Sequence, residues 1–301
     1  EESEDADLMD RYLEGDDLKE DELLADLLTA ILNGQFHPVI PVNSLNGLGT
    51  DQLLTVIAGS FPDPSTHTVA VTSTDGQDLE SLAGDPSGPL VAEVIRTTSD
   101  QFAGRLSLVR IYNGTLKADD VVHVCGHRSL FTGRSDDAHP DHDGEERVGP
   151  LTIPSGIETV SVPQAIAGQL VYVAKLAKAE TSDTLSAKDR PAVVEPWNLP
   201  EPLLPVAIRA ETRADEDKLP AALARLAVED TTVRVERTVE TDQIVLWTMG
   251  QGHVDLLLNR LGSRYGVKVV TEDLLVPLRE TFITKATAMG RHVKQSGGHG
   301  Q

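Results

Sequence analysis

Between Leu18 and Asn33 the apolar residues recur at the spacing of one face of an α-helix. They are Leu23, Leu24, Leu27, Leu28, Ile31 and Leu32. Gly34 follows at the position where a glycine in the left-handed conformation commonly ends a helix. The pattern therefore predicts one amphipathic helix over residues 18–33.

Two more elements are predicted before residue 60. The run PVIPV at 38–42 is typical of a short buried strand. The turn NSLNGLGT then leads into a helix over 51–59, which Thr50 or Asp51 is suited to cap. A helix, a strand and a helix form an α/β fragment too small to close a sheet. We therefore expect residues 1–62 to be the C-terminal part of a larger α/β domain, and the chain to be an excised part of a longer protein.

The middle of the chain changes to a β pattern. Residues 63–88 are rich in proline and polar residues, which predicts a linker with room for one strand. Over 89–195, short β-type runs alternate with turn signals, which predicts an antiparallel β-barrel or sandwich. These runs are LVAEVIRT, GRLSLVRIYNG, DVVHVCGH, IETVSV and QLVYVAKL. The loop over 133–146 is so polar that we expect it to be exposed.

Residues 196–278 alternate strand and helix patterns in the order βαββαβ. The two predicted helices carry one apolar face each, and Arg213, Asp215 and Asp217 suit the entry to the first helix. Two split βαβ halves of similar length predict a ferredoxin-like two-layer sandwich. This fold hosts many functions, so by itself it assigns none.

The charge of the chain is uneven. The formal net charge is −22 over 301 residues. Residues 1–26 hold 13 acidic side chains against Arg11 and Lys19, whereas residues 279–301 carry a net charge of +3. No apolar run approaches the roughly 20 residues that a membrane helix needs, and the start is not a signal peptide. These two observations lead us to expect a cytoplasmic protein. The single cysteine, Cys125, permits no internal disulfide, which fits a reducing compartment.

One group of residues has the composition of a metal site. His123, Cys125 and His127 alternate, so a strand would turn all three to one face, and His139 or His142 could complete a tetrahedral zinc site. Structural zinc sites usually bring paired ligands from tight turns, however, and histidines around one small residue are more often incidental. The sequence therefore leads us to assign no metal.

Four segments in order resemble the elongation factor G family of translational GTPases. LEGDDLKEDELLADLLTAILNGQFHPVIPV is similar to the end of the GTPase domain, and DQFAGRLSLVRIYNGTLKADDVV to the β-barrel second domain. EPLLPVAIRAETRADEDKLPAALARLAVED with WTMGQGHVDLLLNRL resembles the third domain. RETF with GRHVKQSGGHGQ resembles the start of the fourth, which places a truncated fourth domain at 279–301.

The resemblance implies a multidomain α/β plus β protein and a set of partners. It implies a monomer that binds the ribosome through rRNA and small-subunit proteins, with GTP and Mg²⁺ as cofactors of the full-length parent. No GxxxxGK[ST] and no NKxD occurs in this chain, so the chain alone should hydrolyse nothing. The implied role is to relay nucleotide state during translocation, with the proline-rich joints at 62–64 and 196–205 absorbing domain rotation.

The resemblance also implies individual site residues. Asn43 and Ser44 stand where the guanine loop of the family usually reads Ser-Ala; a plain strand-to-helix turn is the alternative. Gln251 and His253 lie in a turn implied to relay nucleotide state; the alternative is helix entry and core packing. A final set is implied to contact rRNA backbone, unless it is a tail created by truncation: Arg291, His292, Lys294, Gln295, Gly297 and Gly298.

Two other functions stay open. The departures at 43–44 and 251–252 and the strong acidity also fit a diverged paralogue that protects or regulates the ribosome without supporting translocation. A translocation assay without the ordinary factor separates these. The third hypothesis is a nonenzymatic protein-binding scaffold, which the absence of a P-loop upstream in the gene would favour.

Overall fold

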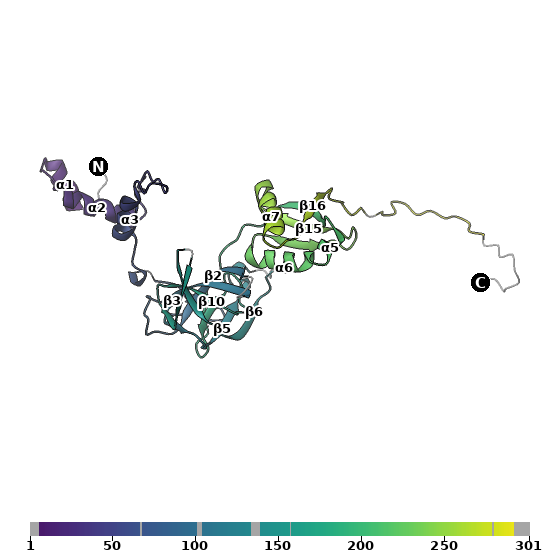
Figure 1. The fold of residues 1–301 in the computed structure, drawn as a ribbon, viewed down its shortest axis with the longest axis horizontal. Helices are drawn as coiled ribbons and strands as arrows, with labels where there is room; N and C mark the ends of the chain where they lie inside the picture. The colour runs from purple at the N-terminus through teal and green to yellow at the C-terminus, as the bar shows by residue number, and fades with distance from the viewer. Residues whose placement is uncertain are drawn as a thin grey trace. The chain divides into compact units, whose positions relative to one another are not determined.

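The computed structural model describes residues 6–66, 68–100, 104–133, 139–156, 158–278 and 280–291. The chain divides into two compact units, residues 1–199 and 200–301, which are described separately below (Figure 1). The domain boundaries given above remain predictions.

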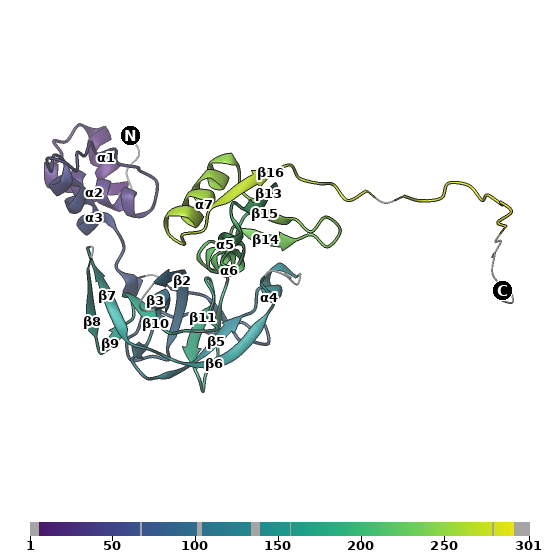
Figure 2. The same cartoon turned by 45° about the vertical axis from the view of Figure 1, so that its right-hand side comes forward.

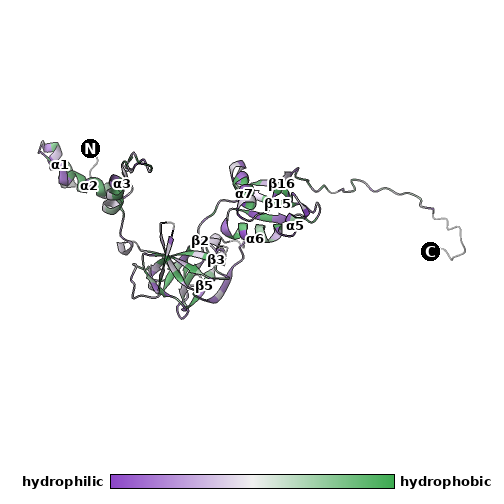
Figure 3. Ribbon diagram, viewed as in Figure 1, coloured by the Kyte–Doolittle hydropathy of each residue, from purple (hydrophilic) through white to green (hydrophobic). Residues whose placement is uncertain are grey.

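Within the described residues, three α-helices precede the β-structure: α1 (Ala6–Glu14), α2 (Glu20–Leu32) and α3 (Thr50–Ser60). The helix predicted over 18–33 is confirmed as α2, and Gly34 after it has φ +72. Figure 3 marks hydrophobic positions along α2 and α3, yet Leu24 and Leu54 keep 53% and 61% of their surface exposed. The apolar faces of these helices are therefore only partly covered.

The strand predicted at 38–42 is wrong. This segment has neither helix nor strand, and Val39 is 95% exposed. A strand needs a hydrogen-bonded neighbour, and in the described part of the chain no strand lies beside this segment. The pairing found nearby is an isolated bridge between Asn43 and Leu48.

The predicted cap of the next helix is also wrong. The N-cap of α3 is Gly49, with φ +76 and no side-chain cap. A Cβ at Gly49 would lie 2.0 Å from the Pro41 carbonyl oxygen, so only glycine fits this close approach. The Thr50 hydroxyl instead donates backward to the Gly47 carbonyl, at 2.7 Å.

Part of the segment predicted as a linker folds onto the β-structure. After the short helix η1 (Pro64–Thr66), strand β1 (Val71–Thr72) pairs antiparallel with β12 (Val193–Val194). Val71 and Val194 join Val91 and Ala192 in a small buried cluster. The single strand predicted within the linker at 63–88 is β1.

The main sheet of this unit is antiparallel and has, among the described residues, eight strands in the order β6-β5-β11-β2-β3-β10-β7-β8, curved around one apolar core (Figure 2). The five predicted runs are confirmed as strands. The strands of the sheet are β2 (Val91–Asp100), β3 (Gly104–Asn113), β5 (Val121–Gly126), β6 (His142–Arg147), β7 (Leu151–Ser155), β8 (Glu158–Val162), β10 (Leu170–Ala174) and β11 (Thr184–Ala187). A separate pair joins β4 (Thr115–Lys117) to β9 (Gln164–Ile166), and α4 (Ser129–Thr132) follows β5.

The predicted barrel is not closed. Within the described residues no strand pairing joins β6 to β8, so these two strands are the edges of an open sheet. The expectation that residues 133–146 are wholly exposed is also wrong. Residues 142–147 form β6, and Glu146 is 8% exposed.

The second unit is a ferredoxin-like sandwich, as predicted. Its antiparallel sheet has the order β14-β15-β13-β16, so the first strand lies between the third and the fourth, and α6 and α7 cover one face (Figure 2). Leu226, Leu246, Leu257 and Leu261 in the core between the layers are fully buried. The elements are β13 (Leu204–Ala210), α5 (Arg213–Glu216), α6 (Leu219–Glu229), β14 (Arg234–Arg237), β15 (Ile244–Thr248), α7 (Gln251–Ser263) and β16 (Val269–Glu272).

Candidate functional site

The side chain of Asn43 is occupied by its own turn. Its Oδ1 accepts a hydrogen bond from the Leu45 backbone N–H at 3.0 Å, and Ser44 beside it is exposed. Asn46 makes the same kind of contact, because its Oδ1 accepts a hydrogen bond from the Leu48 backbone N–H at 3.1 Å. Both asparagines shape the turn before α3, which is the common local role of asparagine.

His253 lies at the start of α7 and links two elements of the second unit. Its Nδ1 accepts from the Met249 N–H at 3.1 Å, so Nε2 carries the proton and donates to the Asp230 carboxylate at 3.1 Å. Asp230 also accepts from Thr232 and lies 3.6 Å from Arg260. Burial acts to raise the pKa of Asp230, but the hydrogen bonds from Thr232 and His253 outweigh it and lower that pKa.

Gln251 does not join this network. Its Nε2 donates to Asp255 Oδ1 at 3.0 Å, one turn along the exposed side of α7. The structure therefore places His253 between α7 and the end of α6, and leaves Gln251 on the surface.

The predicted RNA-contacting set lies almost entirely outside the described residues. Arg291 is described and exposed; His292, Lys294, Gln295, Gly297 and Gly298 are not described. Residues 280–291 contain no helix or strand among those described.

A cluster of histidines and carboxylates occupies the outer face of β5 and β6. His123 and Cys125 point away from the core, because Val122 and Val124, which alternate with them along β5, are buried in it. Asp143 on β6 is the cross-strand partner of Cys125. His123 Nε2 lies 2.8 Å from Asp143 Oδ1, and His127 Nε2 lies 2.5 Å from Asp143 Oδ2. Two imidazoles and a thiol therefore meet at one carboxylate.

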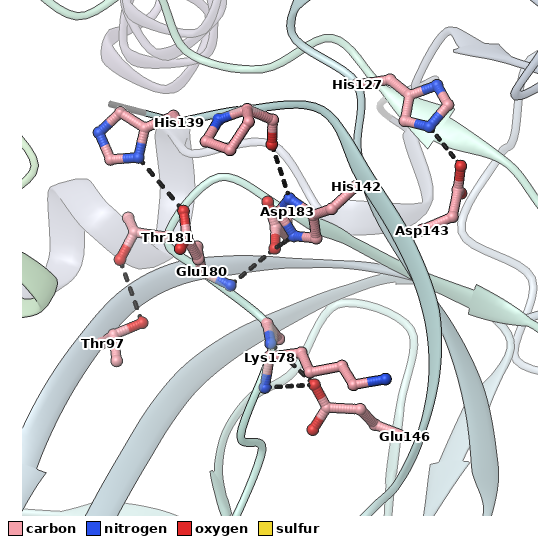
Figure 4. A network of polar contacts seen from close by, with 12 residues as sticks. Thr97, His127, His139, His142, Asp143, Glu146, Lys178, Glu180, Thr181 and Asp183 are labelled. Atoms are coloured by element: carbon pink, nitrogen blue, oxygen red, sulfur yellow. Dashed lines mark hydrogen bonds and ion pairs between the residues drawn. The ribbon is translucent and has the colours of Figure 1, made fainter. Parts of the chain in front are cut away.

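Two more histidines pair with other carboxylates (Figure 4). His142 Nε2 lies 2.9 Å from Asp183 Oδ2, and His139 Nδ1 lies 3.2 Å from Glu180 Oε2. His142 Nδ1 lies 3.1 Å from the Pro140 carbonyl oxygen. The hydrogen bond to Asp183 raises the pKa of His142 to about 9, and the contact with the Pro140 carbonyl acts in the same direction. Burial acts to lower this pKa but is outweighed. His142 packs directly against Gly126, where a Cβ would lie 2.4 Å from its Cε1.

Glu146 is a structural carboxylate that the sequence did not reveal. Its oxygens accept backbone N–H groups from Ala177, Lys178 and Ala179 at 2.6, 2.5 and 2.9 Å (Figure 4). The donors lie 31 to 33 residues away, so no local signal in the sequence indicates this contact. The carboxylate fixes the turn that carries Glu180 and Asp183.

Comparison with known proteins gives two family matches on this chain. Residues 89–188 match "Elongation factor G domain 2", and residues 199–273 match "Elongation Factor G, domain III". The matches coincide with the open β-sheet and the ferredoxin-like sandwich.

Individual relatives extend the match. The whole chain is 50% identical to a protein named "Elongation factor G-like protein" in two strains of Mycobacterium tuberculosis. The chain spans 42% of the length of these relatives. A crystal structure of a protein from Thermus thermophilus has a TM-score of 0.65 and 28% identity, covering 91% of this chain and 36% of that one.

In the part of the chain that the structure describes, no helix combines the length and apolarity needed to cross a membrane. The two matched units stand in the family's order, and the alignment to the curated relatives covers the whole chain. The chain belongs to the elongation factor G family.

Proposed function

We propose that this chain is the coupling part of a ribosome-binding, GTP-hydrolysing translation factor of the cytoplasm that promotes translocation. Its role would be to carry the nucleotide state of the GTPase domain to rRNA and small-subunit proteins. The chain spans less than half of its curated relatives, so this activity is proposed for the full-length protein.

One observation carries the proposal. Two independently cored units, each matching an elongation factor G domain, follow one another through a segment without helix or strand at 195–203. This segment contains Pro196, Pro200 and Pro202. Rigid units joined by a short non-repetitive segment are suited to rigid-body reorientation, because the change in backbone angles is confined to the joint.

GTP and Mg²⁺ belong, in this proposal, to residues outside this chain. The chain has no phosphate-binding loop motif, and Asn43 uses its side-chain oxygen in its own turn. The proposal therefore assigns no nucleotide contact to the described residues. Arg291 and the basic residues after it are proposed to approach rRNA phosphates.

The proposal is tested with the full-length protein and ribosomes of the source organism. Peptidyl-tRNA translocation is measured with the ordinary elongation factor left out. GTP-dependent translocation at multiple turnover is the expected result. Binding without translocation would reject the proposed activity.

Domain reorientation needs a separate measurement. Donor and acceptor dyes are placed at Glu158→Cys in β8 and Leu256→Cys in α7, both exposed. The native Cys125 is buried and should react slowly. We expect different transfer efficiencies with a nonhydrolysable GTP analogue and with GDP. Equal efficiencies on the ribosome in both states would contradict a relay through these units.

A second candidate is a paralogue that acts on the ribosome without translocation. It is favoured by Asn43, whose oxygen is engaged within its turn, and by Gln251, whose side chain donates to Asp255 in its own helix. Ribosome binding together with a failed translocation assay would select this candidate.

A further inference from the structure

The β5–β6 face brings three metal-ligating side chains together, and His127, which follows β5, contacts one of them. One ligand atom each of His123, Cys125 and Asp143 lies within 4.8 Å of the others. His127 Nε2 is 2.5 Å from the second oxygen of the Asp143 carboxylate. We propose that His123, Cys125, His127 and Asp143 bind one divalent transition-metal ion of the Zn²⁺ class, a site independent of the proposed ribosomal function.

Strand register places three of the four proposed ligands. Because Val122 and Val124 are anchored in the core, His123 and Cys125 must face outward together. The pairing of Cys125 with Asp143 brings the carboxylate over the same face. Cys125 is buried at the bottom, the two imidazoles are 16% and 17% exposed, and Asp143 is 43% exposed. An ion can therefore enter from the Asp143 side without a change in the sheet.

The donor set suits zinc. Two imidazole nitrogens, one thiolate and one carboxylate oxygen are ligands that Zn²⁺ accepts in a tetrahedral arrangement. The charges of thiolate and carboxylate together balance a divalent cation. In the present structure two imidazole nitrogens converge on one carboxylate. Metal–ligand bonds would replace these hydrogen bonds, and the side chains would move apart to admit the ion, because the N···O distances of 2.5 and 2.8 Å are too short to hold it between them.

Metal binding requires the Cys125 thiol to lose its proton. Burial, reinforced by Asp143, raises the pKa of the Cys125 thiol, so the free site holds a protonated sulfur. On binding, the sulfur–hydrogen bond is replaced by a sulfur–metal bond and the proton passes to solvent. In the free site each imidazole donates its Nε2 proton to Asp143, so coordination frees the lone pair of Nε2 and the ring carries its proton at Nδ1 instead, exchanged through solvent. No electron is transferred.

The structure also separates these ligands from the other two histidines considered for the site. His139 is paired with Glu180, and His142 lies between Pro140 and Asp183. Both histidines therefore bind other groups, and Asp143 replaces them as the fourth ligand of the proposed site. His139 is therefore a matched control within the same loop region.

The test is a titration of the full chain, prepared without a histidine tag and with His292→Gln and His299→Gln to remove background binding. Zn²⁺ binding is followed by calorimetry, and Co²⁺ is used as a spectroscopic probe. We expect one ion per chain, visible bands of tetrahedral intensity and a near-ultraviolet sulfur-to-cobalt band. His123→Gln and Asp143→Asn should each weaken binding at least about tenfold, whereas His139→Gln should leave it unchanged.

Cys125→Ser provides the sharpest readout. It should remove the sulfur-to-cobalt band, and circular dichroism reports whether each variant is folded. Absence of stoichiometric binding by the unsubstituted ligand set would overturn the proposal. So would equal weakening by His139→Gln, or a sulfur-to-cobalt band that survives in Cys125→Ser.

Discussion

At the level of single residues, two carboxylates, Glu146 and Asp230, each accept several hydrogen bonds. Glu146 is 8% exposed and accepts three backbone N–H groups. Asp230 accepts from Thr232 and His253. A carboxylate is an acceptor only, so an isosteric amide, which carries two N–H groups, tests each arrangement.

Glu146→Gln should destabilise the first unit by about 2–3 kcal/mol, because an NH₂ group would face a backbone donor and charge-assisted hydrogen bonds would be lost. Chemical denaturation measures the change. Glu145→Gln is the matched control, since Glu145 is exposed and pairs at 2.8 Å with Lys188, which is itself exposed. Its effect should stay below about 0.5 kcal/mol. Equal effects of the two variants would refute the role given to Glu146.

Asp230→Asn should destabilise the second unit by about 1–2 kcal/mol at neutral pH, through the loss of charge-assisted hydrogen bonds. The native pKa of Asp230 lies below the ordinary aspartate value of 3.8, so its carboxylate stabilises the fold above that value. This contribution is lost as the pH falls through the native pKa. Chemical denaturation of the unsubstituted chain and of Asp230→Asn, from neutral pH to below the native pKa, should give unfolding free energies that converge at low pH. Asp217→Asn is the control, because Asp217 is exposed. If the difference in unfolding free energy between the two proteins grew as the pH falls, the stabilising role given to the Asp230 carboxylate would be refuted.

At the level of elements, two glycines with different surroundings make a direct comparison. Gly252 lies in the first turn of α7, and a Cβ there would meet nothing within 4 Å. Gly149 precedes β7, and a Cβ there would lie 2.1 Å from the Ala174 carbonyl oxygen. The first glycine is replaceable, whereas the second permits a close approach of two backbone segments.

Gly252→Ala should therefore stabilise the second unit by about 0.5–1 kcal/mol, because alanine favours the helical backbone. Gly149→Ala should destabilise the first unit by about 1–3 kcal/mol, since the carbonyl must move. Denaturant titration gives both values. A loss of stability in Gly252→Ala would indicate that this glycine is required at the helix start.

At the level of the whole molecule, the two units have separate apolar cores, one in the β-sheet and one in the sandwich. Each core is contained within one unit. Separate cores are the physical basis for separate cooperative unfolding.

Scanning calorimetry should accordingly resolve two transitions. Gly252→Ala should shift only the transition of the second unit, and Glu146→Gln only that of the first. A single transition that both substitutions move together would mean that the units unfold as one, and would weaken the case for rigid-body reorientation at 195–203.

The sequence alone determined the elements whose signal is local. Helical spacing from Leu23 to Leu32 predicted α2, and the βαββαβ order with its apolar faces predicted the second unit, because side-chain periodicity follows directly from backbone geometry. The resemblance found in four segments was confirmed at the family level by the two domain matches.

Only the tertiary structure decided what depends on partners far apart in the chain. PVIPV has the composition of a strand, but no described neighbour pairs with it, and composition alone cannot supply one. The sequence pattern placed Glu146 in an exposed loop, whereas in the structure its carboxylate accepts three backbone N–H groups from residues 177–179. The same holds for Asp143, which meets His123 and Cys125 only because the pairing of β5 with β6 fixes their register. Hydrogen bonds and ligand sets of this kind are formed by register and folding, which local sequence patterns do not encode.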